Sequence, residues 1–287
     1  MAERKKIIPT KKPPIKRSPI ARKTSMSKSK TPISEKKIIF GTAFLVLIIM
    51  VMIHLSGCLN ELKAEKIARS YIKCREFGIH MPTLYPINGI DVSIHQGQMN
   101  WKLLKEVSSD DIKIDFAFIK ASEGRTRVDP FFKYNWEQAE KYGFIRGAYH
   151  FFLPNKSGKE QAALFLKTAN LEDGDLTAVC DIEITGGADQ ETLNLNLAEW
   201  LDAVEKATGK KPLIYSSKKF YEKYLREEFS DYPLWIAHFN VPGLELESGS
   251  KWHFWQHNDK GRVKGIKKNL DFNVFNGSME ELDQLRI

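Results

Sequence analysis

Two acidic residues end the apolar run at residues 178–183, "AVCDIE", with one isoleucine between them. If this run is a strand, Asp181 and Glu183 point to the same side, with their α-carbons about 6.6 Å apart. Two carboxyl groups this close do not both ionise readily at neutral pH, so one pKa should be raised and that group can remain a proton donor. The general acid of glycoside cleavage requires a raised pKa, so the pair is a candidate for that chemistry.

The D-x-E spacing also has a structural interpretation. Asp181 and Glu183 could be solvated loop carboxylates just past a strand, or they could cap a following helix. Polar residues that end other apolar runs favour the catalytic interpretation, because such a constellation is harder to obtain by accident: Asp91 in "NGIDVS", Lys120 and Glu123 in "FAFIKASEG", His150 in "GAYHFF" and His238 in "LWIAHF".

Aromatic residues lie on or beside the same run ends. Sugar rings have apolar faces that stack on aromatic surfaces, although most aromatic residues at such positions belong to a core. The candidates are Tyr149, Phe151, Phe152, Tyr215, Trp235 and Trp255.

The elements that must position these residues alternate between short apolar runs and longer helical patterns. Strands are expected at 89–92, 115–120, 146–151, 177–183, 212–216, 234–238, 252–256 and 270–273. Helices are expected at 101–107, 132–142, 159–170, 191–208 and 217–228, where apolar residues recur at spacings of three and four.

Strand followed by helix, repeated, predicts an α/β fold with a parallel sheet and helices packed outside it. Eight strands in about 200 residues suggest closure into a barrel. The last three strands lie too close together for helical crossovers. We therefore expect a modified TIM-like (β/α)5(β)3 barrel, with the reactive residues at the C-terminal ends of its strands.

The N-terminal segment differs in character from the rest of the 287-residue chain. Residues 1–37 hold 13 Lys and Arg against two acids, a net charge of +11, so the remaining residues carry 8 − 11 = −3. Their Lys, Arg, Pro and Ser content predicts a disordered tail. A nucleic-acid-binding arm is the alternative, and the apolar segment that follows argues against it.

Residues 38–55 are almost entirely apolar and contain no Asp, Glu, Lys or Arg. This length predicts a membrane anchor, assigned to residues 38–57, and the basic tail before it predicts that the tail is cytoplasmic and the rest of the chain is outside. The stretch 55–58, "LSGC", also resembles the lipobox of bacterial lipoproteins, which would be cleaved before an acylated Cys58. Both alternatives tether the chain to a membrane outside the cytoplasm.

Residues 58–87 are expected to be a spacer, with a short amphipathic helix at 59–78 and a turn-rich linker after it. The catalytic domain is expected at 88–287, acting as a monomer. Three cysteines give no disulfide framework. The sequence contains no metal-site spacing among its histidines, no glycine-rich phosphate loop and no G-x-S-x-G elbow, so a hydrolase without cofactor is what remains.

Eight ordered motifs resemble the glycoside hydrolase family 25 lysozymes, and they span nearly all of residues 88–287. They are "GIDVSIHQGQMNW" at 89–101, "FAFIKASEG" at 116–124, "GAYHFF" at 147–152, "VCDIE" at 179–183, "PLIYS" at 212–216, "LWIA" at 234–237, "FWQH" at 254–257 and "LDFNVFNG" at 270–277. The tail, the anchor and the spacer lie outside the resemblance.

This resemblance implies hydrolysis of the β-1,4 bond between N-acetylmuramic acid and N-acetylglucosamine in peptidoglycan. It implies that Glu183 is the general acid and later the base, and that Asp181 orients the acetamido group of the substrate as an internal nucleophile. Asp91 and Asp271 match the two further active-site acids of the family.

Tyr149, Tyr215, Trp235 and Gln256 match positions that line the sugar groove of the family. His150 and Phe151, in the same motif as Tyr149, are expected to bind substrate with them. His238 and Phe239 depart from the more usual ending after "LWIA", which leaves the preferred muropeptide open. A catalytically inactive peptidoglycan-binding barrel and a chitinase-like enzyme are the alternatives.

Overall fold

The structure is a computed structural model that describes residues 35–107, 112–247, 249–263 and 266–287, with side chains described at 44–61 and from residue 70. The basic tail expected at 1–37 lies almost wholly outside the described residues. The chain divides into two compact units, Met1–Cys58 and Leu59–Ile287.

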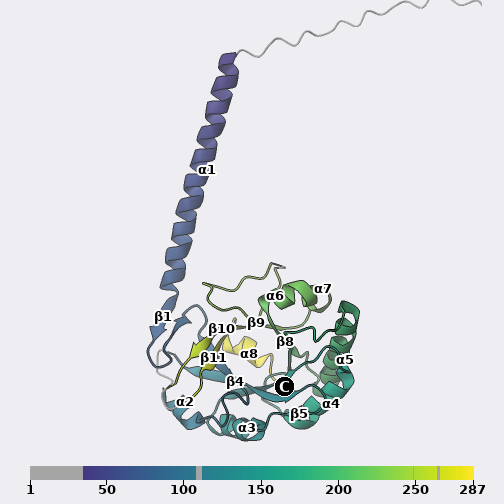
Figure 1. Cartoon of the computed structure of the whole chain (residues 1–287). Coiled ribbons are helices and arrows are strands. Elements are labelled where there is room, and N and C mark those ends of the chain that lie inside the picture. Colours follow the sequence, from purple (N-terminus) through teal and green to yellow (C-terminus); the bar gives the residue numbers. More distant parts are fainter. Residues whose placement is uncertain (1–34, 108–111, 248, 264–265) are drawn as a thin grey trace, which may run out of the picture. The chain divides into compact units, whose positions relative to one another are not determined.

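One long helix, α1 (Glu35–Arg69), begins in the first unit and ends in the second (Figure 1). Its stretch Phe44–Glu61 is long and apolar enough to cross a membrane, and none of that stretch is buried. Large apolar side chains exposed along a helix are typical of a surface that contacts a membrane or another protein. The stretch is therefore a candidate membrane span or signal segment, and it overlaps the anchor expected at 38–57.

A β-hairpin follows α1, where the sequence analysis expected helix as far as residue 78. Strands β1 (Tyr71–Cys74) and β2 (Ile79–Pro82) pair antiparallel in a two-stranded sheet. The turn between them includes Gly78, whose φ of 68° is accessible to glycine without strain. The helical prediction was therefore wrong beyond Arg69.

The hairpin packs on the barrel that follows it. Phe77, in its turn, is fully buried, and its ring centroid lies 4.8 Å from that of Phe272 on a barrel strand. Cys74, Ile79 and Met81 join the same buried cluster. The residues just after α1 are thus part of the folded second unit.

Eight strands of the described chain close into a barrel, which confirms the predicted fold. They are β3 (Ile87–Val92), β4 (Ile114–Glu123), β6 (Ile145–Phe151), β7 (Val179–Asp181), β8 (Leu213–Ser217), β9 (Leu234–Ala237), β10 (Phe254–Gly261) and β11 (Leu270–Phe275). Neighbouring strands from β3 to β10 run parallel. Strand β11 lies antiparallel between β10 and β3 and closes the ring, while β5 (Arg127–Val128) pairs only with the end of β4.

Helices occupy the first five crossovers, and none occurs in the described residues between the last three barrel strands, as expected. They are α2 (Trp101–Val107), α3 (Phe132–Lys141), α4 (Gly158–Ala169), α5 (Gln190–Thr208) and the composite α6 (Lys218–Phe220), η1 (Tyr221–Leu225) and α7 (Arg226–Phe229). The helix expected at 217–228 is thus interrupted by one π-helical turn. A short helix that the sequence analysis did not expect, α8 (Met279–Asp283), follows β11.

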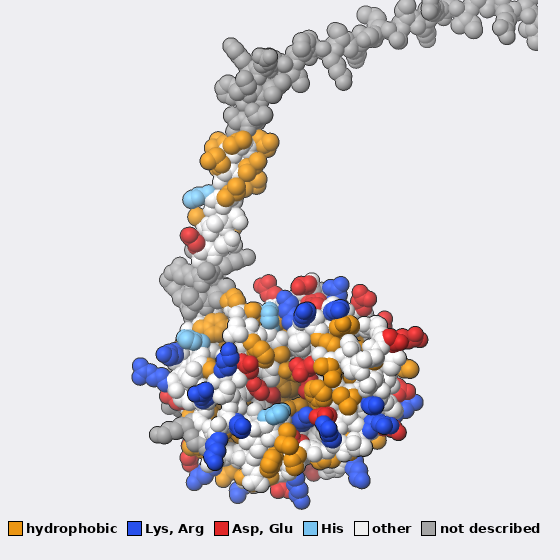
Figure 2. All heavy atoms as spheres, in the orientation of Figure 1, with side chains coloured by type: hydrophobic (Ala, Val, Ile, Leu, Met, Phe, Trp, Pro, Cys, Tyr) orange, Lys and Arg blue, Asp and Glu red, His pale blue; other side chains and the backbone are white. Residues whose placement is uncertain are grey.

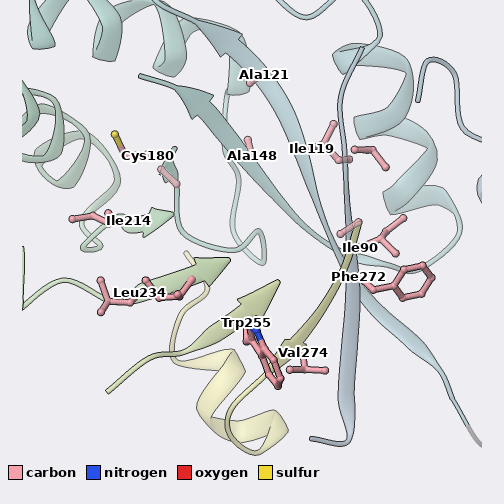
Figure 3. Close-up of a cluster of buried hydrophobic side chains, with 14 of the residues drawn as sticks. Ile90, Ile119, Ala121, Ala148, Cys180, Ile214, Leu234, Trp255, Phe272 and Val274 are labelled. Atoms are coloured by element: carbon pink, nitrogen blue, oxygen red, sulfur yellow. The ribbon is translucent and has the colours of Figure 1, made fainter. Parts of the chain in front are cut away.

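Side chains alternate along each barrel strand between two buried layers. The outer layer packs under the helices and includes Ile90, Ile119, Ala148, Cys180, Ile214 and Phe272 (Figure 3). The inner layer fills the barrel with Ile87, Phe116, Phe118, Leu213, Trp235, Phe254 and Phe275. Polar side chains of the inner face, among them Asp91, Gln256 and Asn273, lie beyond this apolar layer, toward one end of the barrel.

Two strand glycines make room for the inner phenylalanines. A Cβ atom on Gly89 would come within 2.3 Å of the Phe116 ring, and one on Gly147 within 2.6 Å of the Phe118 ring. The Phe118 ring in turn stacks on Trp235, with centroids 4.4 Å apart. This tightly packed apolar layer lies directly beneath the polar end of the barrel.

Candidate active site

A cavity of about 240 Å³ opens at the barrel end where the parallel strands finish. Strand β11 runs the other way and therefore presents its first residues there. Nine of the ten expected site residues line this cavity, all from inward-facing positions: Asp91, Tyr149, Phe151, Asp181, Glu183, Tyr215, Trp235, Gln256 and Asp271. Figure 2 shows a hollow in this face of the second unit, bordered by acidic and apolar side chains.

His150 is the exception, because its side chain does not line the cavity. Its side chain is fully buried on the outer side of β6, where Nδ1 lies 2.8 Å from Ser122 Oγ and the ring stacks on Trp200. Burial lowers the pKa of His150 to about 4, so the imidazole is neutral. The sequence could have predicted this outward orientation of His150. Side chains alternate along a strand, and its neighbours Tyr149 and Phe151 point inward.

Four residues of the cavity wall were not among the expected site residues. Ser93, His95 and Gln96 come from the loop directly after β3, and Lys120 comes from β4. Their positions in the sequence could have indicated them, because each lies near the end of a strand, or directly after one, that carries a polar residue at this end of the barrel.

Lys120 brings a positive charge to the acidic wall. Its Nζ lies 2.9 Å from Glu123 Oε2 and 4.9 Å from the centre of the Phe151 ring. Glu123 also pairs with Arg127 at 2.7 Å and does not line the cavity. The Glu123 carboxylate therefore fixes the lysine that faces the site.

A hydrogen-bond network joins five barrel strands beneath the cavity. Asp91 Oδ2 accepts from Gln256 Nε2 at 2.7 Å and from Asn273 Nδ2 at 2.8 Å. The Tyr215 hydroxyl donates to Gln256 Oε1 at 2.8 Å, and Trp235 Nε1 donates to Asn273 Oδ1 at 2.8 Å. The two amides therefore connect the Asp91 carboxylate to the two aromatic side chains of the wall.

Asp91 and Asp271 are opposite each other on the antiparallel strands β3 and β11. Burial raises the pKa of Asp91 to about 6, although its two amide donors favour the ionised form. Burial raises the pKa of Asp271 to about 8, and the negative charges of Asp91 and Asp259 add to the shift. At neutral pH Asp271 therefore retains a proton more readily than Asp91 does.

Asp181 and Glu183 lie across the ring from Asp271, at the end of β7. Asp181 is buried, and burial together with the charge of Glu183 raises its pKa well above the usual value. Within the described residues its Oδ1 has no hydrogen-bond partner. Such a buried, unpaired polar atom is costly and marks a place that a ligand group can satisfy.

Glu183 is the exposed member of the pair, at the cavity mouth. The surrounding protein raises its pKa by desolvation, and the nearby Tyr215 hydroxyl opposes that shift. From the sequence, repulsion between the two carboxyl groups was expected to raise the pKa of one of them. The repulsion acts chiefly on the buried Asp181, and burial is the larger cause for both groups.

The arrangement suits acid–base chemistry on a sugar substrate. Four carboxyl groups with raised pKa values face one cleft, and aromatic side chains form its floor and walls. Groups that hold a proton near neutral pH can donate it to a leaving oxygen. In the described ranges, no three or more His, Cys, Asp or Glu side chains are grouped so that they could hold a metal ion.

Comparison with known proteins points to one family. The family model described as Glycosyl hydrolases family 25 matches residues 90–266. The chain is 44% identical to the uncharacterized protein YegX of Escherichia coli strain K12 over 74% of this chain and 78% of that protein. It is 34% identical to Lysozyme M1 of Streptomyces globisporus over 68% of this chain and 70% of that protein.

Solved structures agree with this match. A family 25 glycosyl hydrolase from Bacillus anthracis superimposes with a TM-score of 0.67 at 31% identity, over 75% of this chain and 99% of that one. A bacterial lysozyme from Streptomyces coelicolor gives a TM-score of 0.63 at 30% identity, over 70% of this chain and 96% of that one.

The raised pKa of Asp271 predicts a pH-dependent gain in stability for Asp271→Asn. Between about pH 4 and about pH 8, the unfolded chain releases a proton that the folded chain retains, so rising pH favours unfolding. The variant lacks this group. We expect the free energy of unfolding of the variant to exceed that of the wild type at pH 8 by about 1 kcal/mol or more, which corresponds to about 2–4 °C in Tm. This difference should disappear toward pH 4.

Thermal unfolding of the full-length protein in detergent, followed by tryptophan fluorescence across this pH range, measures the difference. The exposed Asp173 provides the control, and Asp173→Asn should show no such trend. An Asp271→Asn protein that is no more stable than the wild type at pH 8 would contradict the assigned shift.

Proposed function

Because this chain belongs to glycosyl hydrolases family 25, we propose that it is a peptidoglycan hydrolase of the lysozyme type. The bond cleaved is the β-1,4 linkage between N-acetylmuramic acid and N-acetylglucosamine. The observation that carries the proposal is the convergence of Asp91, Asp181, Glu183 and Asp271 on one cleft whose walls include Tyr149, Tyr215 and Trp235.

Glu183 is assigned as the general acid and then the general base. Its place at the cavity mouth supports this role, because the group must reach a glycosidic oxygen and exchange protons with water. Its raised pKa favours the protonated form in which the reaction starts. In the second half of the reaction, Glu183 would take a proton from the water that attacks the sugar.

Asp181 is assigned to the acetamido group of the substrate. A sugar N–H would satisfy Asp181 Oδ1, which has no partner in the described part of the chain. Held in this way, the acetamido oxygen attacks the anomeric carbon while Glu183 protonates the departing oxygen. Water then opens the resulting ring, so the substrate supplies the nucleophile in an exception to the usual two-carboxylate scheme.

Asp91 and Asp271 complete the acidic wall, with Gln256 as a positioning residue. The hydrogen bonds from Tyr215 to Gln256 and from Gln256 to Asp91 support this assignment, since they fix the aromatic ring relative to the carboxylate. Tyr149, Phe151 and Trp235 are assigned to the apolar faces of the sugars. A pre-positioned wall loses little entropy when substrate binds.

We further propose that the Phe44–Glu61 stretch is an uncleaved single-pass anchor and that the catalytic domain, residues 88–287, acts outside the cytoplasm as a monomer. The exposure of every side chain in this stretch supports a lipid-facing role. Peptidoglycan is extracytoplasmic, so the proposed substrate requires the same location.

Glu183→Gln tests the acid assignment. Glutamine keeps the size of the side chain but cannot donate the proton, so we expect clearing of purified cell walls to fall by about 10²–10⁴-fold. Asp181→Asn should reduce the rate of clearing by a smaller factor, because Glu183 remains able to protonate the leaving oxygen. Turbidity loss of a cell-wall suspension, with equal amounts of full-length protein, measures both variants.

Glu191→Gln is the matched control, because Glu191 is an exposed glutamate in the first turn of α5. It should clear walls at the wild-type rate, and all three variants should unfold cooperatively. Clearing by Glu183→Gln at the wild-type rate would overturn the assignment.

Mass spectrometry of protein extracted from membranes tests the anchor. An uncleaved helix predicts peptides from both sides of Cys58 in one chain, with an unmodified thiol. A chain that begins at a lipid-modified Cys58 would contradict the anchor and support the lipoprotein alternative.

A further inference from the structure

A second cavity, of about 700 Å³, shares the Glu183 side chain with the first. Its basic wall consists of Lys218, Lys219, Lys223 and Arg226, from α6, η1 and α7, and we call it the cationic cavity. In the view of Figure 2, Lys and Arg side chains gather above the central hollow, over the position of α6 in Figure 1. The acidic cleft and the cationic cavity thus meet at the proposed general acid.

Positive charge in this cavity is not neutralised by its own acids. Lys219 and Lys223 are exposed, and neither forms an ion pair with another described residue. Lys218 lies 4.0 Å from Glu247, which is a long pair with a mostly exposed partner. Exposed pairs of this kind contribute little, so the lysines can engage another anion.

Glu222, which lines the cavity together with Glu247 and Glu183, is occupied within the protein. Its side chain is 9% exposed, Oε1 accepts a hydrogen bond from the Glu247 backbone N–H, and Oε2 lies 3.6 Å from Arg226. It therefore holds the loop at Glu247 and the α7 end of the wall in place. It does not cancel the charges of Lys219 and Lys223.

The fold also fixes where these lysines lie. Ser217 ends β8 and caps α6 by accepting a hydrogen bond from the Phe220 N–H. Phe220 and Tyr221 are buried beside the lysines and hold the segment against the barrel. Strand β8 also carries Tyr215 of the acidic cleft. The basic wall therefore begins only a few residues along the chain from the active site.

We propose that the cationic cavity binds carboxylates of the peptide stem attached to the glycan, beside the bond that Glu183 cleaves. The inference rests on the proposed function. In a peptide-bearing strand the lactyl carboxyl of each muramic acid is joined to the stem as an amide, so the sugars are uncharged and an acidic cleft suits them, whereas the stem peptides carry carboxylates. Lysine ammonium groups are mobile point charges that suit a flexible anion, and the cavity volume is sufficient for a short peptide.

This arrangement makes the enzyme selective for peptide-bearing strands. A glycan whose stems an amidase has removed retains only the lactyl carboxylate on each muramic acid and lacks the more distant carboxylates of the stem, so it should bind the lysines more weakly. Phosphate esters on the sugars would offer the same anionic chemistry and must be separated by experiment.

The test compares kcat/KM of the full-length protein in detergent on three substrates. These are peptide-bearing glycan strands free of phosphate, the same strands after an amidase has removed the stems, and stem-free strands that carry phosphate esters. The wild type should prefer the peptide-bearing strands, mainly through KM. This preference should shrink as salt rises, because exposed charges are screened.

Lys219→Gln/Lys223→Gln should lower the ratio of kcat/KM for peptide-bearing over stem-free strands by about three- to tenfold, as expected for two exposed ion pairs. Lys141→Gln/Lys167→Gln is the matched control, since both are exposed lysines in the last turns of α3 and α4 that line neither cavity. The control should keep the wild-type ratio.

Three results would overturn the inference: no wild-type preference for stems, a ratio that the Lys219→Gln/Lys223→Gln variant leaves unchanged, or a preference that follows phosphate. The proposed function would fail in a different way. In that case the wild-type protein would cleave none of the three substrates.

Discussion

The structure depends on how the barrel satisfies the carboxylate of Asp91. Gln256 from β10 and Asn273 from β11 both donate to its Oδ2, and these contacts join residues 165 and 182 positions apart in the chain. An ionised carboxylate buried without donors would cost several kcal/mol. The two amides therefore stabilise the closure of the ring where β11 inserts antiparallel, and they hold the walls of the cleft through Tyr215 and Trp235.

The other acids follow from the same closure. Strand β11 carries Asp271 opposite Asp91, and β7 adds Asp181 and Glu183, so burial raises the pKa of each group in a cleft that already contains negative charge. These groups lower the free energy of unfolding as pH rises, and the burial of the apolar layers on both faces of the barrel must offset this loss. A cluster of carboxyl groups with raised pKa values is typical of sites that transfer protons.

The sequence predicted the strands and the inward-facing acids because both depend on local patterns. Apolar runs mark the strands, and the spacing of two in "AVCDIE" places Asp181 and Glu183 on one side. The same rule, applied to "GAYHFF", would have removed His150 from the site. The hairpin after α1 was missed because spacings of three and four continue past Arg69, and the packing of Phe77 on Phe272 that favours the hairpin is long-range. The roles of Gln256 and Asn273 toward Asp91, and the basic wall that meets the cleft at Glu183, likewise depend on contacts that no local pattern contains.

The central claim is that this cleft cuts the glycan on the reducing side of N-acetylmuramic acid. Digestion of purified peptidoglycan by the full-length protein, followed by mass spectrometry of the products after borohydride reduction, tests it most directly. We expect soluble muropeptides whose reduced ends are muramic acid. Products with reduced glucosamine ends, or walls left intact, would contradict it.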